Sequence, residues 1–268
     1  MAKVFIDAKE VKEGRFIDAR FNLKEKNWAQ LEYDRDHIQG ALYWDLERDL
    51  SDLSKSDGRH PLPSKDKLQQ LFEHSGLQLE DTIYIYDQGA APFASRAWWM
   101  LKYANFPNVY IVNGGYNALK EAGFAISTEV PTVAPTKLEI NWNDSIYASR
   151  EDVKNIVDKK ESATILDARA AERYRGENEP IDRIAGHIPT AKNFDWEQLI
   201  EGTSLQPNEK LKQKVSKDEE IVVYCGSGVT ASTLYSVLEE AGYEKLRLYV
   251  GSFSDWINHY DVETGENL

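Results

Sequence analysis

The most reactive side chain in this sequence is its single cysteine, Cys225. It follows an apolar run at residues 221–224 and precedes the segment Gly226-Ser227-Gly228-Val229-Thr230-Ala231. Two glycines and two hydroxyl residues allow backbone N–H groups to turn toward the sulfur, and a following helix would add the positive end of its dipole. Both effects favour the nucleophilic thiolate. A lone cysteine is more often a small buried apolar residue, but this position favours a catalytic nucleophile.

The elements expected around Cys225 place it at the edge of a sheet. The continuous apolar run at 221–224 is typical of a strand buried on both faces of a parallel sheet. Apolar residues and Thr233 recur at helical spacing over 229–241, with Gly242 as a cap, which predicts a helix there. Sites in open α/β sheets lie at the carboxyl ends of the strands. The sequence therefore predicts Cys225 between such a strand end and a helix.

The same pattern occurs twice along the chain. Residues 16–20 (FIDAR), 37–41 (HIQGA), 83–87 (IYIYD) and 109–114 (VYIVNG) recur in order as 165–169 (ILDAR), 187–191 (HIPTA), 221–225 (IVVYC) and 246–251 (LRLYVG). Alternating strand and helix patterns predict an α/β fold with a mainly parallel sheet flanked by helices in each half. We expect domains at 1–130 and 143–268, joined by a proline-containing linker at 131–142. In the first repeat, Asp87 occupies the cysteine position.

Composition narrows the class of partner. The chain has 268 residues and a net charge of −13, which disfavours nucleic acid and membrane surfaces as partners. An anionic small-molecule substrate is still compatible with this charge, because at short range a local cluster of arginines outweighs the field of the negatively charged protein as a whole. The N-terminus lacks the apolar run of a signal peptide, and no stretch is long and apolar enough to span a bilayer. We therefore expect a cytoplasmic protein.

The segment at 224–231 closely resembles the active-site loop of 3-mercaptopyruvate sulfurtransferases of the rhodanese superfamily. Asp167-Ala168-Arg169, Arg173-Tyr174, Glu179-Pro180 and Gly186-His187-Ile188-Pro189 resemble signatures of the same superfamily, so the resemblance covers essentially the whole chain. It implies two tandem rhodanese-like domains, of which only the second is catalytic. It also implies that Cys225 takes sulfur from a small-molecule donor, 3-mercaptopyruvate, as a persulfide. The acceptor would be cyanide or a thiol, either thioredoxin or a small thiol.

The resemblance also assigns roles to several side chains. Arg173 would hold the substrate carboxylate, for which a guanidinium fork is suited; a surface salt bridge with Glu172 or Glu177 is the alternative. Arg183 is a candidate for the second substrate arginine, although its spacing departs from the family pattern. Ser227 would polarise the substrate carbonyl, and His60 would lie near the loop across the domain interface unless it is merely exposed. The remaining residues expected at the donor site are the loop positions Gly226, Gly228, Val229 and Thr230.

Other residues are expected to hold the fold, and other functions stay open. His37 and His187 occupy matching positions in the two repeats, and Arg169 follows a predicted strand, so we expect structural roles for all three.

A thiosulfate-using rhodanese is the first alternative function, although Gly226 and Ser227 offer that dianion no cation. A phosphatase would need an arginine where Ala231 stands. A non-enzymatic persulfide relay or redox sensor is a further alternative.

Neither a metal nor a cofactor is expected. The histidines do not form a Cys/His cluster of the kind that binds a transition metal. Nucleotide-binding glycine motifs do not occur in the sequence.

Overall fold

A parallel sheet forms the centre of each half of the chain in the computed structural model, which describes residues 3–25, 27–90 and 92–266. The first sheet has the order β1-β6-β5-β2-β4, and its strands are β1 (Phe5–Asp7), β2 (Arg15–Asp18), β4 (Leu42–Tyr43), β5 (Ile83–Tyr86) and β6 (Val109–Asn113). The second has the order β13-β12-β8-β9, and its strands are β8 (Thr164–Asp167), β9 (Lys192–Asn193), β12 (Ile221–Tyr224) and β13 (Leu246–Leu248). Every strand pair within these sheets is parallel. The predicted fold class is confirmed.

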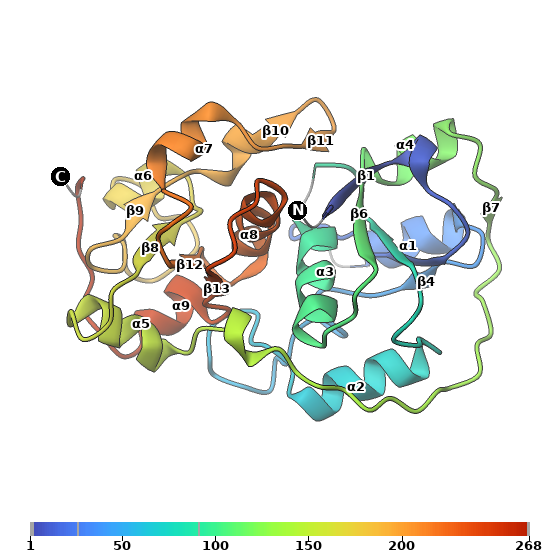
Figure 1. The fold of residues 1–268 in the computed structure, drawn as a ribbon, viewed down its shortest axis with the longest axis horizontal. Coiled ribbons are helices and arrows are strands. Elements are labelled where there is room, and N and C mark those ends of the chain that lie inside the picture. The colour runs from blue at the N-terminus through green and yellow to red at the C-terminus, as the bar shows by residue number, and fades with distance from the viewer. Residues whose placement is uncertain (1–2, 26, 91, 267–268) are drawn as a thin grey trace.

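Helices flank both sheets, and the two halves form lobes that lie side by side (Figure 1). The first lobe contains α1 (Trp28–Arg35), α2 (Lys65–His74), α3 (Phe93–Tyr103) and α4 (Gly115–Glu121). The second contains α5 (Arg150–Val157), α6 (Ala171–Arg175), α7 (Glu209–Lys214), α8 (Val229–Glu240) and α9 (Ser252–Trp256). The helix predicted over 229–241 is α8, which ends at Glu240 with Ala241 as its C-cap.

Short elements complete the chain. Three 3-10 turns are formed by η1 (Ala8–Glu10), η2 (Asp144–Ile146) and η3 (Trp196–Leu199). Two small antiparallel pairs are formed by β3 (His37–Ile38) with β7 (Ile126–Ser127), and by β10 (Ile200–Glu201) with β11 (Ser204–Leu205). Every residue of 131–142 is described, and none lies in a helix or strand. This segment passes α2, where the amide of Thr136 donates to the carbonyl of Glu73.

Corresponding contacts in the two lobes repeat the sequence duplication. His37 stacks on Tyr33 with ring centroids 3.8 Å apart, and His187 stacks on Tyr174 at 3.9 Å. Each imidazole Nδ1 lies within 2.8 Å of the backbone carbonyl of the tyrosine that it stacks on. The same contacts form in the lobe that contains Cys225 and in the lobe that contains no cysteine. Both histidines therefore stabilise the fold, which is the role expected for them.

The arginines that follow β2 and β8, the corresponding strands of the two lobes, also make matching contacts. Arg20 pairs with Asp18 at 2.7 Å, and Arg169 pairs with Asp167 at 2.6 Å. Both guanidiniums also donate to a backbone carbonyl of the segment that returns to the sheet, at Asp36 and Gly186 respectively. All four of these side chains are buried, so the pairs fix the ends of the strands.

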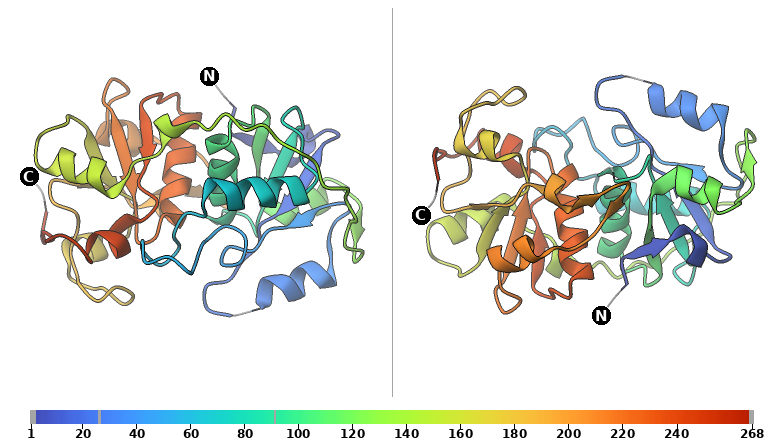
Figure 2. Two further views of the ribbon diagram at one scale, coloured as in Figure 1. Left: turned by 90° about the horizontal axis from the view of Figure 1, so that it is seen from below. Right: turned by 90° about the horizontal axis from the view of Figure 1, so that it is seen from above.

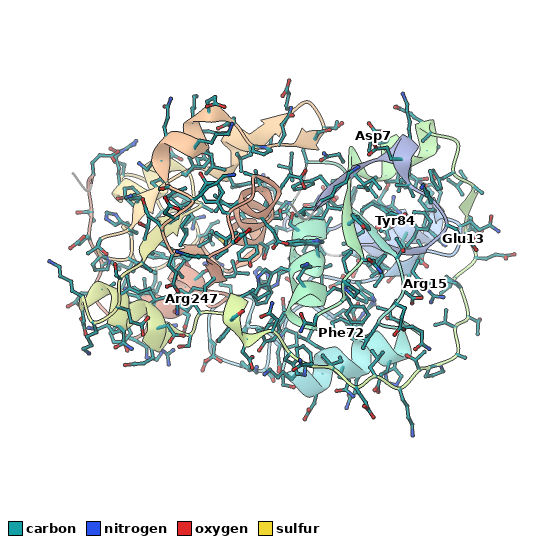
Figure 3. All side chains as sticks on the ribbon, in the orientation of Figure 1. Asp7, Glu13, Arg15, Phe72, Tyr84 and Arg247 are labelled. Atoms are coloured by element: carbon teal, nitrogen blue, oxygen red, sulfur yellow. The ribbon has the colours of Figure 1, made fainter. Side chains whose placement is uncertain are left out.

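The two lobes meet through α3 and α8, which pack against each other between the sheets (Figure 2). The hydroxyls of Ser95 and Ser236 lie 3.4 Å apart there, and Lys102 lies 3.6 Å from Glu239. One hydrophobic cluster extends across this interface from the first lobe, where it includes Phe72 of α2 (Figure 3), into the second. Among the described residues, no helix is both long enough and apolar enough to cross a membrane.

Candidate active site

Cys225 lies directly after β12, in the turn that leads into α8, as the sequence predicts. Its side chain is buried, with 2% of its surface exposed. The amide of Gly228 donates to Sγ across 3.2 Å. Because α8 begins at the next residue, this amide belongs to the N-terminus of the helix, where N–H groups lack partners within the helix. One backbone dipole and the helix terminus therefore face the sulfur.

The turn requires glycine at position 228. Gly228 has a φ of +77°, in the left-handed region. A Cβ there would lie 2.3 Å from the carbonyl oxygen of Val250 and 2.9 Å from Nη1 of Arg96. The strand-to-helix turn that presents Cys225 therefore has no room for a side chain.

The first turn of α9 holds the other side of the loop. The amides of Phe253 and Ser254 donate to the carbonyls of Cys225 and Gly226, each across 3.0 Å. The hydroxyl of Ser252 accepts from the Cys225 amide at 3.1 Å and donates to the Tyr249 carbonyl at 2.8 Å. These bonds fix the loop backbone without using the sulfur.

Ser227 and His60 meet across the lobe interface. The Ser227 hydroxyl lies 2.8 Å from Nδ1 of His60, and both side chains are buried. Burial, followed by the charges of Arg96 and Arg59, lowers the pKa of His60 to about 4. The imidazole is therefore neutral at neutral pH, and Nδ1 can either donate to the hydroxyl or accept from it. The predicted approach of His60 to the loop is observed.

Two arginines reach the loop at Gly226. A Cβ on Gly226 would lie 2.5 Å from Nη2 of Arg59 and 3.5 Å from Nη2 of Arg173. Both guanidiniums contact the carboxylate of Asp182, Arg173 at 3.1 Å. Arg173 is further held by Glu179, with which Nη2 makes a 2.8 Å bond. Burial would raise the pKa of Glu179, but hydrogen bonds from Arg173 and from backbone amides lower it.

These contacts use only part of the Arg173 guanidinium. Its hydrogen bonds to described residues leave from Nε and Nη2. The surface pair with Glu172 or Glu177 that the sequence left open is not what forms, because Glu179 and Asp182 are the partners. The Arg173 side chain is 15% exposed, and its Nη1 and Nη2 lie 3.7 Å and 3.5 Å from where a Cβ on Gly226 would be.

Arg183 lies elsewhere, and the structure differs from the expectation for it. Its guanidinium donates to the carbonyl of Ile257 at 2.5 Å and to the side chain of Asn258 at 3.3 Å, beyond the end of α9. The second arginine near Gly226 is Arg59, from the first lobe. The amides of Ile181 and Asp182 donate to the Glu179 carboxylate that holds Arg173, whereas the guanidinium of the next residue contacts the residues after α9.

The remaining expected residues lie on both sides of the start of α8. Gly226 is buried in the turn, whereas Val229, which is buried, and Thr230, which is half-buried, lie in the first turn of α8. Sequence reasoning missed Arg59 and Arg96. Arg59 adjoins His60, and Arg96 interrupts an apolar helix, which is a signal for a buried charge with a specific role.

The equivalent loop of the first lobe is built differently. Asp87 follows β5, and its carboxylate accepts from the amides of Gly89 at 2.9 Å and Ala94 at 3.0 Å. The carboxylate therefore takes up amides of its own loop, one of them in the first turn of α3. Within the described ranges, no group of three His, Cys, Asp or Glu residues is placed to hold a metal ion.

Comparisons with known proteins give the family. The Rhodanese-like domain family matches residues 2–122 and 149–259. A Pseudomonas aeruginosa protein named "Probable 3-mercaptopyruvate sulfurtransferase" is 37% identical, over 93% of this chain and 92% of its own. A Mycobacterium tuberculosis relative, 34% identical over 90% of this chain and 86% of its own, is named for thiosulfate instead. The solved structure of 3-mercaptopyruvate sulfurtransferase from Leishmania major is 26% identical with a TM-score of 0.84, over 97% of this chain and 75% of that one.

Both halves match one domain family, and full-length relatives above 30% identity are named sulfurtransferases. The chain therefore belongs to the rhodanese family of sulfurtransferases and consists of two tandem rhodanese-like domains.

Proposed function

We propose that this chain transfers sulfur from 3-mercaptopyruvate to a thiol through a persulfide on Cys225. The observation that carries the proposal is the contact between Ser227, in the same loop as Cys225, and His60 of the first lobe, 2.8 Å apart. A hydroxyl donor beside the nucleophile suits a donor molecule whose ketone lies next to the reacting C–S bond. Two nearby guanidiniums, Arg59 and Arg173, suit its carboxylate.

The first half-reaction forms an S–S bond and breaks a C–S bond. The Cys225 thiolate attacks the sulfur of the donor, and the electron pair of the C–S bond moves into the pyruvate enolate. The proton of the donor thiol ends on the carbon, which gives pyruvate and the persulfide anion. Negative charge develops on the ketone oxygen during this step, so a bond from the Ser227 hydroxyl stabilises the transition state more than the ground state.

His60 supports the hydroxyl in this step. Because the imidazole is neutral, it can carry its proton on Nδ1 and donate to Ser227 Oγ. The serine proton is then free to point at the ketone. In the second half-reaction a thiolate acceptor attacks the outer sulfur and releases the Cys225 thiolate. A small thiol or thioredoxin would serve, and we place the reaction in the reducing cytoplasm, where such thiols are available.

Thiosulfate is the second candidate donor, and one observation favours it. The loop itself carries no cation, but Arg59 and Arg173 both reach Gly226, so a dianion would meet more positive charge than the loop sequence alone suggests. Asp182 and Glu179 offset part of that charge. The distinguishing group is therefore Ser227, because thiosulfate has no ketone for it to polarise.

Steady-state kinetics with both donors test the proposal. We expect the wild type to have the higher kcat/KM with 3-mercaptopyruvate. Ser227→Ala should lower that value about 100-fold, on the scale of one lost oxyanion donor, and change the thiosulfate value much less. A wild type that prefers thiosulfate, or an equal loss with both donors in Ser227→Ala, would refute the assignment of the donor.

A further inference from the structure

A fully buried arginine lies against the cysteine loop, and it has no carboxylate partner within residues 3–25, 27–90 and 92–266. Arg96 projects from α3 of the first lobe and has 0% of its surface exposed. Its Nη1 donates to the carbonyl of Gly228 at 3.3 Å. Its Nη2 donates to the carbonyls of Leu50 at 3.2 Å and His60 at 3.0 Å, and Nε has no hydrogen-bond partner among the described residues. Three carbonyl dipoles are weak compensation for a buried charge.

The other arginines around the loop are balanced by carboxylates. Their ion pairs join Arg59, Arg169 and Arg173 to Asp167, Glu179 and Asp182. Three cations thus meet three anions. Arg96 is the additional cation, and its Nη1 donates to the carbonyl of Gly228, the residue whose amide donates to Sγ of Cys225. An ionised Cys225 would supply the anion that Arg96 otherwise lacks among the described residues.

We propose that Arg96 is the counter-charge of the Cys225 thiolate and of the persulfide anion, supplied by the domain that lacks the nucleophile. The persulfide part rests on the proposed function. Gly228 connects the two groups, because its amide donates to Sγ and its carbonyl accepts from Arg96. Arg96 is thus a positioning residue: it stabilises the charge and holds the residue whose N–H faces the sulfur.

The surrounding groups agree with this role. His60 and Arg59 come from the segment before α2, and Arg173 comes from α6. Asp255 of α9 is already engaged by Arg150 at 2.7 Å and by the Tyr249 hydroxyl at 2.6 Å. Burial lowers the pKa of Arg96 to about 10, against the opposing effect of Cys225. The guanidinium therefore stays charged at neutral pH.

The test is the pH dependence of Cys225 alkylation by iodoacetamide, an uncharged reagent, in the full chain. Arg96→Met should move the midpoint upward by at least about one pH unit, which means about tenfold slower alkylation at a pH below both midpoints. Arg96→Lys keeps the charge and should stay within about half a unit of the wild type. Should Arg96→Met fail to fold, Arg96→Gln, which retains hydrogen-bond donors without the charge, should show the same upward shift.

Lys102→Met is the matched control. It removes a cation from the same helix and the same interface, where Lys102 meets Glu239, and it should leave the midpoint unchanged. An unchanged midpoint in the uncharged Arg96 variants, or an equal shift in Lys102→Met, would overturn the role of Arg96. The assay needs no sulfur donor, so a wild type that forms no persulfide would refute the proposed function separately.

Discussion

At the scale of single residues, the carboxylate of Asp182 organises the cationic side of the site. Its side chain is 4% exposed and contacts both Arg59 and Arg173. Burial raises the pKa of Asp182, and the neighbouring arginines oppose that effect. Asp182 therefore holds both guanidiniums beside Gly226, where the carboxylate of a donor would meet them.

Removing either of these arginines should weaken capture of the donor. We expect Arg59→Met and Arg173→Met each to lower kcat/KM for 3-mercaptopyruvate by about 10- to 100-fold, the scale of a lost hydrogen bond to a charged group. The lower kcat/KM should result mainly from a higher KM, with kcat little changed, because the substrate carboxylate is bound in both the ground state and the transition state. Arg183→Met makes the same change of charge on the far side of the segment and should leave both constants near the wild type. A loss in Arg183→Met equal to the loss in Arg59→Met would contradict this assignment.

His60 should make the stability of the protein depend on pH. Its pKa is lowered from 6.5 to about 4 in the folded chain, so between these values the unfolded chain binds a proton that the folded chain does not. The contribution of neutral His60 to the free energy of unfolding is therefore fully present above pH 6.5 and is lost as the pH decreases toward 4. Between about pH 7.5 and 5 this difference amounts to about 2 kcal/mol.

Urea unfolding of wild type and His60→Gln at those two pH values measures the effect. Other groups titrate equally in both proteins, so the variant should lose about 2 kcal/mol less stability on acidification. The comparison concerns the change with pH, so a constant loss of stability in the variant does not affect it. Equal pH dependence in the two proteins would show that His60 titrates normally.

At the scale of elements, the turn between β12 and α8 depends on a backbone conformation that only glycine adopts without strain. Gly228→Ala should destabilise the chain by at least about 1–2 kcal/mol from the left-handed backbone alone, and the collision with the Val250 carbonyl adds to this. Turnover should fall by about 100-fold or more, because the misplaced Gly228 amide no longer faces the sulfur.

The first lobe offers a control for that substitution. Gly40 has a φ of +81°, but a Cβ there would meet nothing within 4 Å. The matching position of the second lobe is Thr190, which adopts a φ of 68°. Gly40→Ala should therefore cost only the backbone strain and leave turnover unchanged. If it impaired turnover as much as Gly228→Ala, the close approach of Val250 would not be what demands glycine.

The elements that carry the cysteine were predictable because their signals are local. The apolar run became β12 and the helical spacing became α8, one residue shorter than expected. α9 was not expected, because five residues with a serine at φ +57° give little helical signal. Its first amides are nevertheless what hold the carbonyls of the loop.

At the scale of the whole molecule, the site is assembled from both lobes. Cys225, Ser227 and Arg173 belong to the second, whereas His60 and Arg59 come from the first. The duplication was visible in the sequence, because the same motifs recur in order. The family resemblance placed His60 near the loop, but it did not identify Arg59, because which other first-lobe residues reach the loop depends on how α3 packs against α8. Arg183 was a candidate because the resemblance implies a substrate arginine after the Glu-Pro element.

The sulfur-carrying role of Cys225 is tested by the mass of the intact protein after brief exposure to 3-mercaptopyruvate without an acceptor. We predict an added mass of one sulfur atom on Cys225, which a reducing thiol removes with the return of the original mass. Cys225→Ser should show neither the adduct nor turnover. Sulfur added elsewhere, or substantial turnover in Cys225→Ser, would contradict the assignment of Cys225 as the sulfur-carrying nucleophile.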